Sequence, residues 1–127
     1  MDRSLLIAGS VFGLLAVLIG AFGAHGLEKY LDADAISAFE TGVKYQMYHA
    51  LLLLVASSLP VTIKVKKNLF FLLVIGVLFF SGSIYGLATN ELTGFDFKKI
   101  ALITPLGGTL LIAAWGMLVY TFLLKNK

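Results

Sequence analysis

The segment Tyr45–Leu54 reads YQMYHALLLL, and it decides how many membrane-spanning helices the chain can form. A glutamine and a histidine stand at the start of a run of apolar residues. The apolar part, Ala50–Ile63, holds about 14 residues, which is too short to cross a hydrocarbon core of about 30 Å. The segment spans a membrane only if it begins near Lys44 and takes Gln46 and His49 into the bilayer. We therefore predict a span over about residues 44–63.

Three other segments are long and almost free of charged residues. Each holds at least about 20 residues, which cover about 30 Å as a helix. The first could be mistaken for a secretory signal, but its apolar core exceeds the usual ~7–15 residues and further spans follow. We interpret it as a retained helix. The predicted spans are about 5–24, 69–88 and 100–124.

The composition agrees with a membrane protein. Of the 127 residues, 59% are hydrophobic and only 13% are charged. A soluble chain of this size could not bury so much apolar surface, so lipid must be the main solvent and partner. We expect an all-α integral membrane four-helix bundle that forms a single domain over residues 1–127. The chain has no cysteine, which excludes disulfides, thiolate metal sites and cysteine nucleophiles.

The connections between the spans are short, except for His25–Val43. This segment has helical periodicity from Asp34 onward, and Asp34 is the expected N-cap. The second helix is therefore predicted to extend beyond the membrane. The basic segment Lys64–Asn68 (KVKKN) is expected to join the second and third spans.

The basic residues favour cytoplasmic termini in the plasma (inner) membrane, by the positive-inside rule. They are scattered at segment ends and form no basic stripe, so nucleic acid is not an expected partner. Six of them lie in the two termini and the connection between the second and third spans: Arg3, Lys64, Lys66, Lys67, Lys125 and Lys127. The other two connections hold four: Lys29, Lys44, Lys98 and Lys99.

Counting along the four spans places their polar residues at one depth, in the outer third of the bilayer. Gln46 and His49 share one helix face and should contact protein, because an unpaired polar group in hydrocarbon is costly. Two roles remain open for this polar patch: hydrogen bonding between helices, or a site for a ligand, a proton or a metal. No catalytic residue, metal ligand or cofactor is assigned. The candidate residues are His49, Gln46, His25, Tyr85, Ser81, Ser83 and Thr104.

Small residues form stripes that allow close approach of helices in lipid. In the fourth span Pro105 is expected to kink the first turns. The expected packing residues are Gly9, Gly13, Gly20, Gly23, Gly82, Gly86, Gly107 and Gly108.

Several motifs together resemble the domain-of-unknown-function 423 family, which includes small bacterial inner-membrane proteins of the YgdD and YwdK type and the animal transmembrane protein 256. The resemblance covers nearly the whole chain. It implies a four-helix membrane protein and no settled activity, so it assigns no functional residue. The motifs are GAFGAHGL at Gly20–Leu27, TGVKYQMYHALLLL at Thr41–Leu54, FSGSIYG at Phe80–Gly86, TPLGG at Thr104–Gly108, and Trp115.

Three classes of function are compatible with the sequence. The favoured one is a binding or assembly module whose polar patch contacts a lipid, a small ligand or a partner membrane protein, or which forms a homo-oligomer through its glycines. An oligomeric transporter or channel is the alternative, although ionisable residues within the spans are scarce. A membrane enzyme that uses His25 and His49 ranks last, because the two histidines lack a metal-binding frame.

Overall fold

The structure, a computed structural model, describes residues 1–89 and 102–125. All regular elements in this part of the chain are helical. A short π-helical turn follows the first helix without a break and leads into a single α-helical turn. The elements are α1 (Asp2–Leu18), η1 (Ile19–Gly23), α2 (Ala24–Leu27), α3 (Ala33–Ala56), α4 (Ile63–Ala88) and α6 (Ile103–Lys125).

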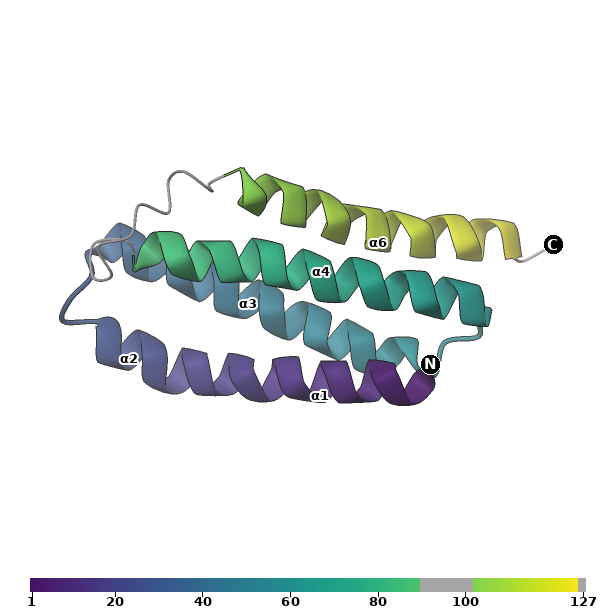
Figure 1. The fold of residues 1–127 in the computed structure, drawn as a ribbon, viewed down its shortest axis with the longest axis horizontal. Coiled ribbons are helices and arrows are strands. Elements are labelled where there is room, and N and C mark those ends of the chain that lie inside the picture. Colours follow the sequence, from purple (N-terminus) through teal and green to yellow (C-terminus); the bar gives the residue numbers. More distant parts are fainter. Residues whose placement is uncertain (90–101, 126–127) are drawn as a thin grey trace.

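The four long helices run in alternating directions (Figure 1). Helices α3 and α4 pack against each other, α1 packs on α3, and α6 packs on α4. Helices α1 and α6 therefore lie on opposite sides of the α3–α4 pair (Figure 1). This arrangement is more open than a four-helix bundle in which each helix packs against two neighbours. The structure therefore does not confirm the predicted bundle.

All four long helices contribute to the core, to which α6 adds Leu111, Ala114 and Leu118. Leu5, Leu53, Leu69 and Leu73 are completely buried there. Outside this core, large apolar side chains cover the outer surfaces; Leu14, for example, is 61% exposed. Burial of an apolar core and exposure of an apolar exterior is the pattern expected of a bundle whose solvent is lipid.

Three helices of the described residues are long and apolar enough to cross a membrane: Asp2–Leu27, Ile63–Ala88 and Ile103–Leu124. They correspond to three of the four predicted spans. Helix α3 is not among them, because Glu40, Lys44, Gln46 and His49 lower the mean hydropathy of its more apolar part.

The ends of α3 differ from the prediction. Asp32, and not Asp34, is the N-cap: its backbone is extended, and its carboxylate accepts a hydrogen bond of 2.8 Å from the Ala35 amide. The helix then ends at Ala56, before the expected Ile63. Ser57 and Ser58 follow in a turn, and Pro60, which cannot donate a backbone hydrogen bond, lies just beyond it.

The basic segment Lys64–Asn68 is not a connection, because it lies in the first turns of α4. Thr62 caps that helix by accepting a hydrogen bond of 3.2 Å from the Val65 amide. The actual connection covers residues 57–62. In α6, Pro105 falls within the first turn, where amide groups have no intrahelical acceptor, so the expected kink has no cause. The predicted start of this span at Ile100 lies outside the described residues.

Candidate functional site

Gln46 connects three helices. Its side chain is 4% exposed, and its Nε2 donates a hydrogen bond of 2.8 Å to the Phe12 carbonyl of α1. Its Oε1 accepts a bond of 2.7 Å from the Tyr85 hydroxyl of α4. The amide thus uses both a donor and an acceptor, and it joins α1, α3 and α4 at one level.

The two serines of α4 have hydrogen-bond partners on α3, on α6 and on α4 itself. Ser81 donates a hydrogen bond of 2.7 Å to the Gly42 carbonyl of α3. Ser83 donates to the Phe80 carbonyl of its own helix at 3.0 Å. Its oxygen also contacts the Thr104 hydroxyl of α6, and since the Ser83 proton is already used, Thr104 is the donor in that pair.

His49 is buried, with 4% of its surface exposed. Each of its two ring nitrogens has a hydrogen-bond partner within the protein. Its Nε2 lies 3.1 Å from Nε1 of Trp115 on α6. The indole nitrogen can only donate, so His49 Nε2 must be the acceptor and Nδ1 must carry the proton. Nδ1 accordingly donates to the Tyr45 carbonyl at 2.6 Å. His49 is therefore neutral in this arrangement, and neither nitrogen is left for a metal.

His25 does not join the polar patch. It lies on α2 with its side chain 85% exposed, and its Nδ1 is 3.7 Å from a carboxylate oxygen of Glu28. The structure does not bring His25 and His49 together, so the expected pair for an enzyme is not formed. No group of three potential metal-ligating side chains occurs among residues 1–89 and 102–125.

Two pockets lie side by side between α3 and α6 and share Trp115; together they are called the α3–α6 groove, with the outer compartment at the Tyr45 end of α3 and the inner compartment at its Ala56 end. The outer compartment has a volume of about 620 Å³ and the inner one about 370 Å³. Trp115 belongs to the wall of both, and none of the lining residues in the described part of the chain is an Asp, Glu, Lys or Arg. The outer compartment is lined by Tyr45, Tyr48, His49, Leu51, Phe80, Gly108, Leu111, Ile112 and Trp115. The inner compartment is lined by Leu52, Val55, Leu59, Trp115, Leu118, Val119 and Phe122.

The glycines of the first helix face α3. A Cβ atom on Gly9 would lie 2.8 Å from the Ala50 carbonyl oxygen, and one on Gly20 would lie 3.0 Å from Val43. Gly23 is similarly close to Phe39, while a Cβ on Gly13 would meet Ala50 at an ordinary 3.9 Å. These contacts are within one chain, so the glycine stripe packs α1 and η1 against α3.

The glycines of α4 and α6 differ from one another. A Cβ on Gly107 would lie 2.8 Å from the Phe79 carbonyl carbon, whereas one on Gly108 would be 3.5 Å from the Phe80 ring. Gly82 faces open space, so it does not mark the close helix approach expected from the sequence. Gly86 is half-buried, and its carbonyl accepts a hydrogen bond of 3.4 Å from the Thr89 hydroxyl.

Sequence reasoning missed two close contacts. A Cβ on Gly42 would lie 2.7 Å from the Tyr85 ring, and one on Gly76 would lie 2.7 Å from Leu111. Gly42 does continue a short series of small residues, Ala35 and Ala38, that the sequence reading did not use, whereas Gly76 has no small residue three or four positions away and spacing gave no signal. Trp115 stands out in the sequence only through the family resemblance, because no local pattern connects it with His49.

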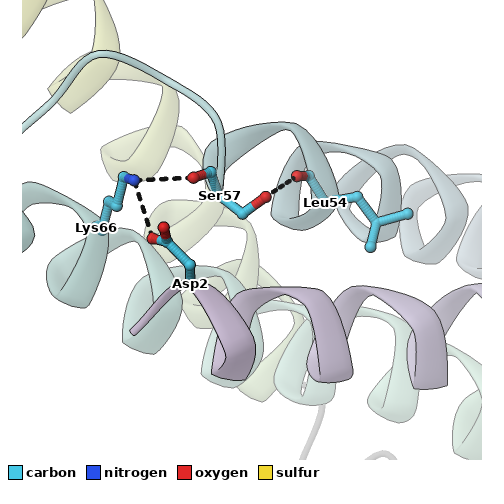
Figure 2. A network of polar contacts seen from close by, with 4 residues as sticks. All are labelled: Asp2, Leu54, Ser57 and Lys66. Atoms are coloured by element: carbon cyan, nitrogen blue, oxygen red, sulfur yellow. Dashed lines mark hydrogen bonds and ion pairs between the residues drawn. The ribbon is translucent and has the colours of Figure 1, made fainter.

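A second polar cluster lies at the opposite end of α3 (Figure 2). The Lys66 ammonium donates to Asp2 Oδ1 at 2.9 Å and to the Ser57 carbonyl at 2.8 Å. The Ser57 hydroxyl in turn donates to the Leu54 carbonyl at 2.7 Å. The Lys66 side chain is 12% exposed, and it places a cation at the carboxyl end of α3, where backbone carbonyls lack helical partners. This cluster joins the start of α1, the end of α3 and the start of α4.

These features define a small helical membrane protein with apolar outer surfaces, an internal polar network and an uncharged groove. Comparison with known proteins agrees, since the model of the family described as "Protein of unknown function (DUF423)" matches residues 19–108. The chain belongs to this family, which confirms the resemblance seen in the sequence.

Its relatives are bacterial membrane proteins of similar length. It is 44% identical to UPF0382 membrane protein SSP2132 of Staphylococcus saprophyticus, covering 90% of this chain and 92% of the relative. It is 38% identical to UPF0382 membrane protein YwdK of Bacillus subtilis, covering 90% and 91%. It is 36% identical to UPF0382 inner membrane protein YgdD of Escherichia coli, covering 99% and 95%. No solved structure matches the chain.

Proposed function

We propose that α3 also crosses the membrane, which makes the chain a four-span protein with both termini in the cytoplasm. The alternating directions of the four long helices support this arrangement (Figure 1). The polar residues Gln46 and His49 do not oppose it, because their hydrogen bonds are satisfied by protein. The name of the Escherichia coli relative and the distribution of basic residues favour the inner membrane and this orientation.

The absence of cysteine allows a direct test of topology. Asp34 lies in the first turn of α3, Lys64 lies in the first turn of α4, just beyond the other end of α3, and both are exposed. In intact cells, a membrane-impermeant maleimide should label Asp34→Cys, and it should label Lys64→Cys only after the membrane is permeabilised. Equal labelling of both variants would show that α3 does not cross the membrane, and the reverse pattern would invert the orientation.

The groove between α3 and α6 is the basis of the proposed activity, which is binding of an uncharged or weakly polar amphiphile taken from the bilayer. The observation that carries this proposal is the outer compartment of about 620 Å³, which falls in the usual range of ligand sites of about 300–1,000 Å³. Its lining is mainly apolar with a few polar atoms, as in most small-molecule sites.

The Trp115–His49 hydrogen bond argues for a flexible ligand rather than a partner helix. The two rings meet across the space between α6 and α3, and their centroids are 6.1 Å apart. A helix has a diameter of about 10 Å with its side chains, so it could not lie along the whole groove without breaking this bond. A chain of methylene groups can pass beside it. The transporter hypothesis finds no support here, because the inner compartment has no ionisable side chain.

Native mass spectrometry of protein released from mild detergent tests the binding proposal. The wild type should retain a stoichiometric amphiphile. Gly108→Phe should lose it, because the added ring enters the outer compartment. Gly116→Phe is the matched control: it adds the same ring to α6 at an exposed position that lines neither compartment. Absence of any adduct from the wild type, or its retention by Gly108→Phe, would refute the proposal.

A further inference from the structure

The outer compartment is unusually rich in aromatic side chains for a groove that faces lipid. Tyr45 is the centre of the group: its ring centroid is 4.8 Å from that of Phe80, 5.8 Å from that of Tyr48 and 6.1 Å from that of His49. The planes of Tyr45 and His49 differ by only 22°. Trp115 extends the series through His49. Rings at these separations interact favourably in offset or edge arrangements, and a further flat ring can join them.

The charge of the lining restricts the head of the ligand. Among residues 1–89 and 102–125, no Asp, Glu, Lys or Arg side chain lines the outer compartment. A phosphate or an ammonium group would lose its hydration there without gaining an opposite charge, which is unfavourable. A neutral head therefore suits the described lining of this compartment better than a phosphate or an ammonium group does.

The polar groups of the lining select hydrogen-bond acceptors. Both nitrogens of His49 are engaged within the protein. Tyr45 and Tyr48 are 40% and 55% exposed and carry phenolic hydroxyls, which can donate a proton to a carbonyl oxygen. A ligand with carbonyl groups on a flat ring would match both the stacked rings and the hydroxyl donors.

The inner compartment supplies space for a tail. Apart from Trp115, it is lined by aliphatic side chains and Phe122, and it adjoins the outer compartment at Trp115. Between Tyr45 and Val55, the first and last lining residues within α3, a helical rise of about 1.5 Å per residue gives about 15 Å, which matches the ~15 Å thickness of one leaflet. A long apolar tail therefore fits beside the ring site without leaving the groove.

We propose that the α3–α6 groove binds a quinone-class amphiphile, with the neutral ring between Tyr45, Tyr48 and Trp115 and the apolar tail in the inner compartment. This inference rests on the proposed binding function and names the chemical class of its ligand. Binding alone is proposed, and no electron transfer is assigned.

Trp115 makes the test direct, because it is the only tryptophan in the chain. The probe is decylubiquinone, a benzoquinone with a short alkyl tail, added to protein in nanodiscs made of one synthetic lipid. Its binding to the groove should quench Trp115 fluorescence in a saturable manner with one site per chain. Decanol, which has a similar tail and no ring, should leave the quinone titration unchanged at equal concentration.

A second reporter separates binding from collisional quenching by quinone dissolved in the lipid. The double variant Trp115→Phe and Tyr120→Trp moves the tryptophan to a position that is 66% exposed and lines neither compartment. Quenching of the tryptophan at position 120 should rise with quinone concentration without reaching saturation. A wild-type response of the same linear form would overturn the inference.

Groove variants complete the test. Gly108→Phe should weaken the saturable phase at least about tenfold, and Gly116→Phe should leave it unchanged. If Gly108→Phe fails to fold, Ile112→Phe serves instead, because Ile112 lines the compartment and is 73% exposed. Equal quinone affinity in the groove variant and the wild type would overturn the inference. A native adduct that Gly108→Phe removes, together with no saturable quinone binding, would retain the proposed function and reject the quinone class.

Discussion

Removing the Tyr85 hydroxyl should destabilise the protein more than replacing the amide to which it binds. Tyr85→Phe leaves Oε1 of Gln46 without its donor in a side chain that is 4% exposed. An unsatisfied buried acceptor costs about 1–3 kcal/mol. Gln46→Leu instead removes two interhelical bonds, to Phe12 and Tyr85, which average about 0.6 kcal/mol each in membrane proteins. It also leaves the Tyr85 hydroxyl without its acceptor, but Tyr85 is only half-buried, so this costs less than stranding the buried Oε1 of Gln46. We therefore expect a loss of about 2 kcal/mol for Tyr85→Phe and about 1 kcal/mol for Gln46→Leu.

The double variant measures the coupling itself. Once Gln46 is leucine, Tyr85→Phe no longer strands an acceptor, so the two losses should not add. The coupling free energy should be about 2 kcal/mol, because Tyr85→Phe causes this loss in the wild type and no longer causes it in Gln46→Leu. Reversible unfolding in mixed micelles, followed by the loss of helical circular dichroism, gives these values. Tyr120→Phe is the control, because Tyr120 is 66% exposed and its removal should change little.

Two results would refute this reasoning. Strict additivity of Gln46→Leu and Tyr85→Phe would mean that the hydroxyl and the amide do not interact. A Tyr85→Phe protein as stable as the Tyr120→Phe control would mean that Oε1 of Gln46 is not buried in the way the structure shows.

Three further predictions concern other contacts. Gly107→Ala should destabilise the protein by about 1–3 kcal/mol, because its Cβ would meet the backbone of α4; Gly82→Ala, which faces open space, should be neutral or stabilising by up to ~1 kcal/mol in the same unfolding assay. Nitrogen-15 NMR should find His49 neutral with its proton on Nδ1, and a proton on Nε2 would contradict the hydrogen bond from the indole. Lys66→Met should lower the free energy of unfolding by about 1–2 kcal/mol through loss of a charge-assisted bond, whereas the exposed Lys67→Met should change it by less than ~0.5 kcal/mol; equal effects would mean that the cluster in Figure 2 does not stabilise the fold.

The ends of the helices show where sequence patterns are weakest. Both Asp32 and Asp34 are suitable caps, and the choice depends on which residue has the extended backbone. Pro60 and the two serines before it signal a break after Ala56, but the apolar residues around them favour one continuous span. Boundaries of this kind follow from local geometry, to which hydropathy is insensitive.

The membrane setting of this protein follows from composition and periodicity alone. Lipid as solvent follows from the apolar fraction, and burial of Gln46 and His49 follows from the cost of an unpaired polar group in hydrocarbon. The family follows from motifs that are distributed along the chain. These inferences depend on the chemistry of single segments, which the sequence contains in full.

The partners of those polar groups were decided only by the tertiary structure. His49 and Trp115 are 66 residues apart, and nothing in either segment predicts their bond. The open order of the helices leaves a groove between α3 and α6, and the close contacts of Gly42 and Gly76 depend on how each helix is rotated. Periodicity defines the faces of a helix but not which neighbour each face meets, because that choice depends on packing among all the helices at once.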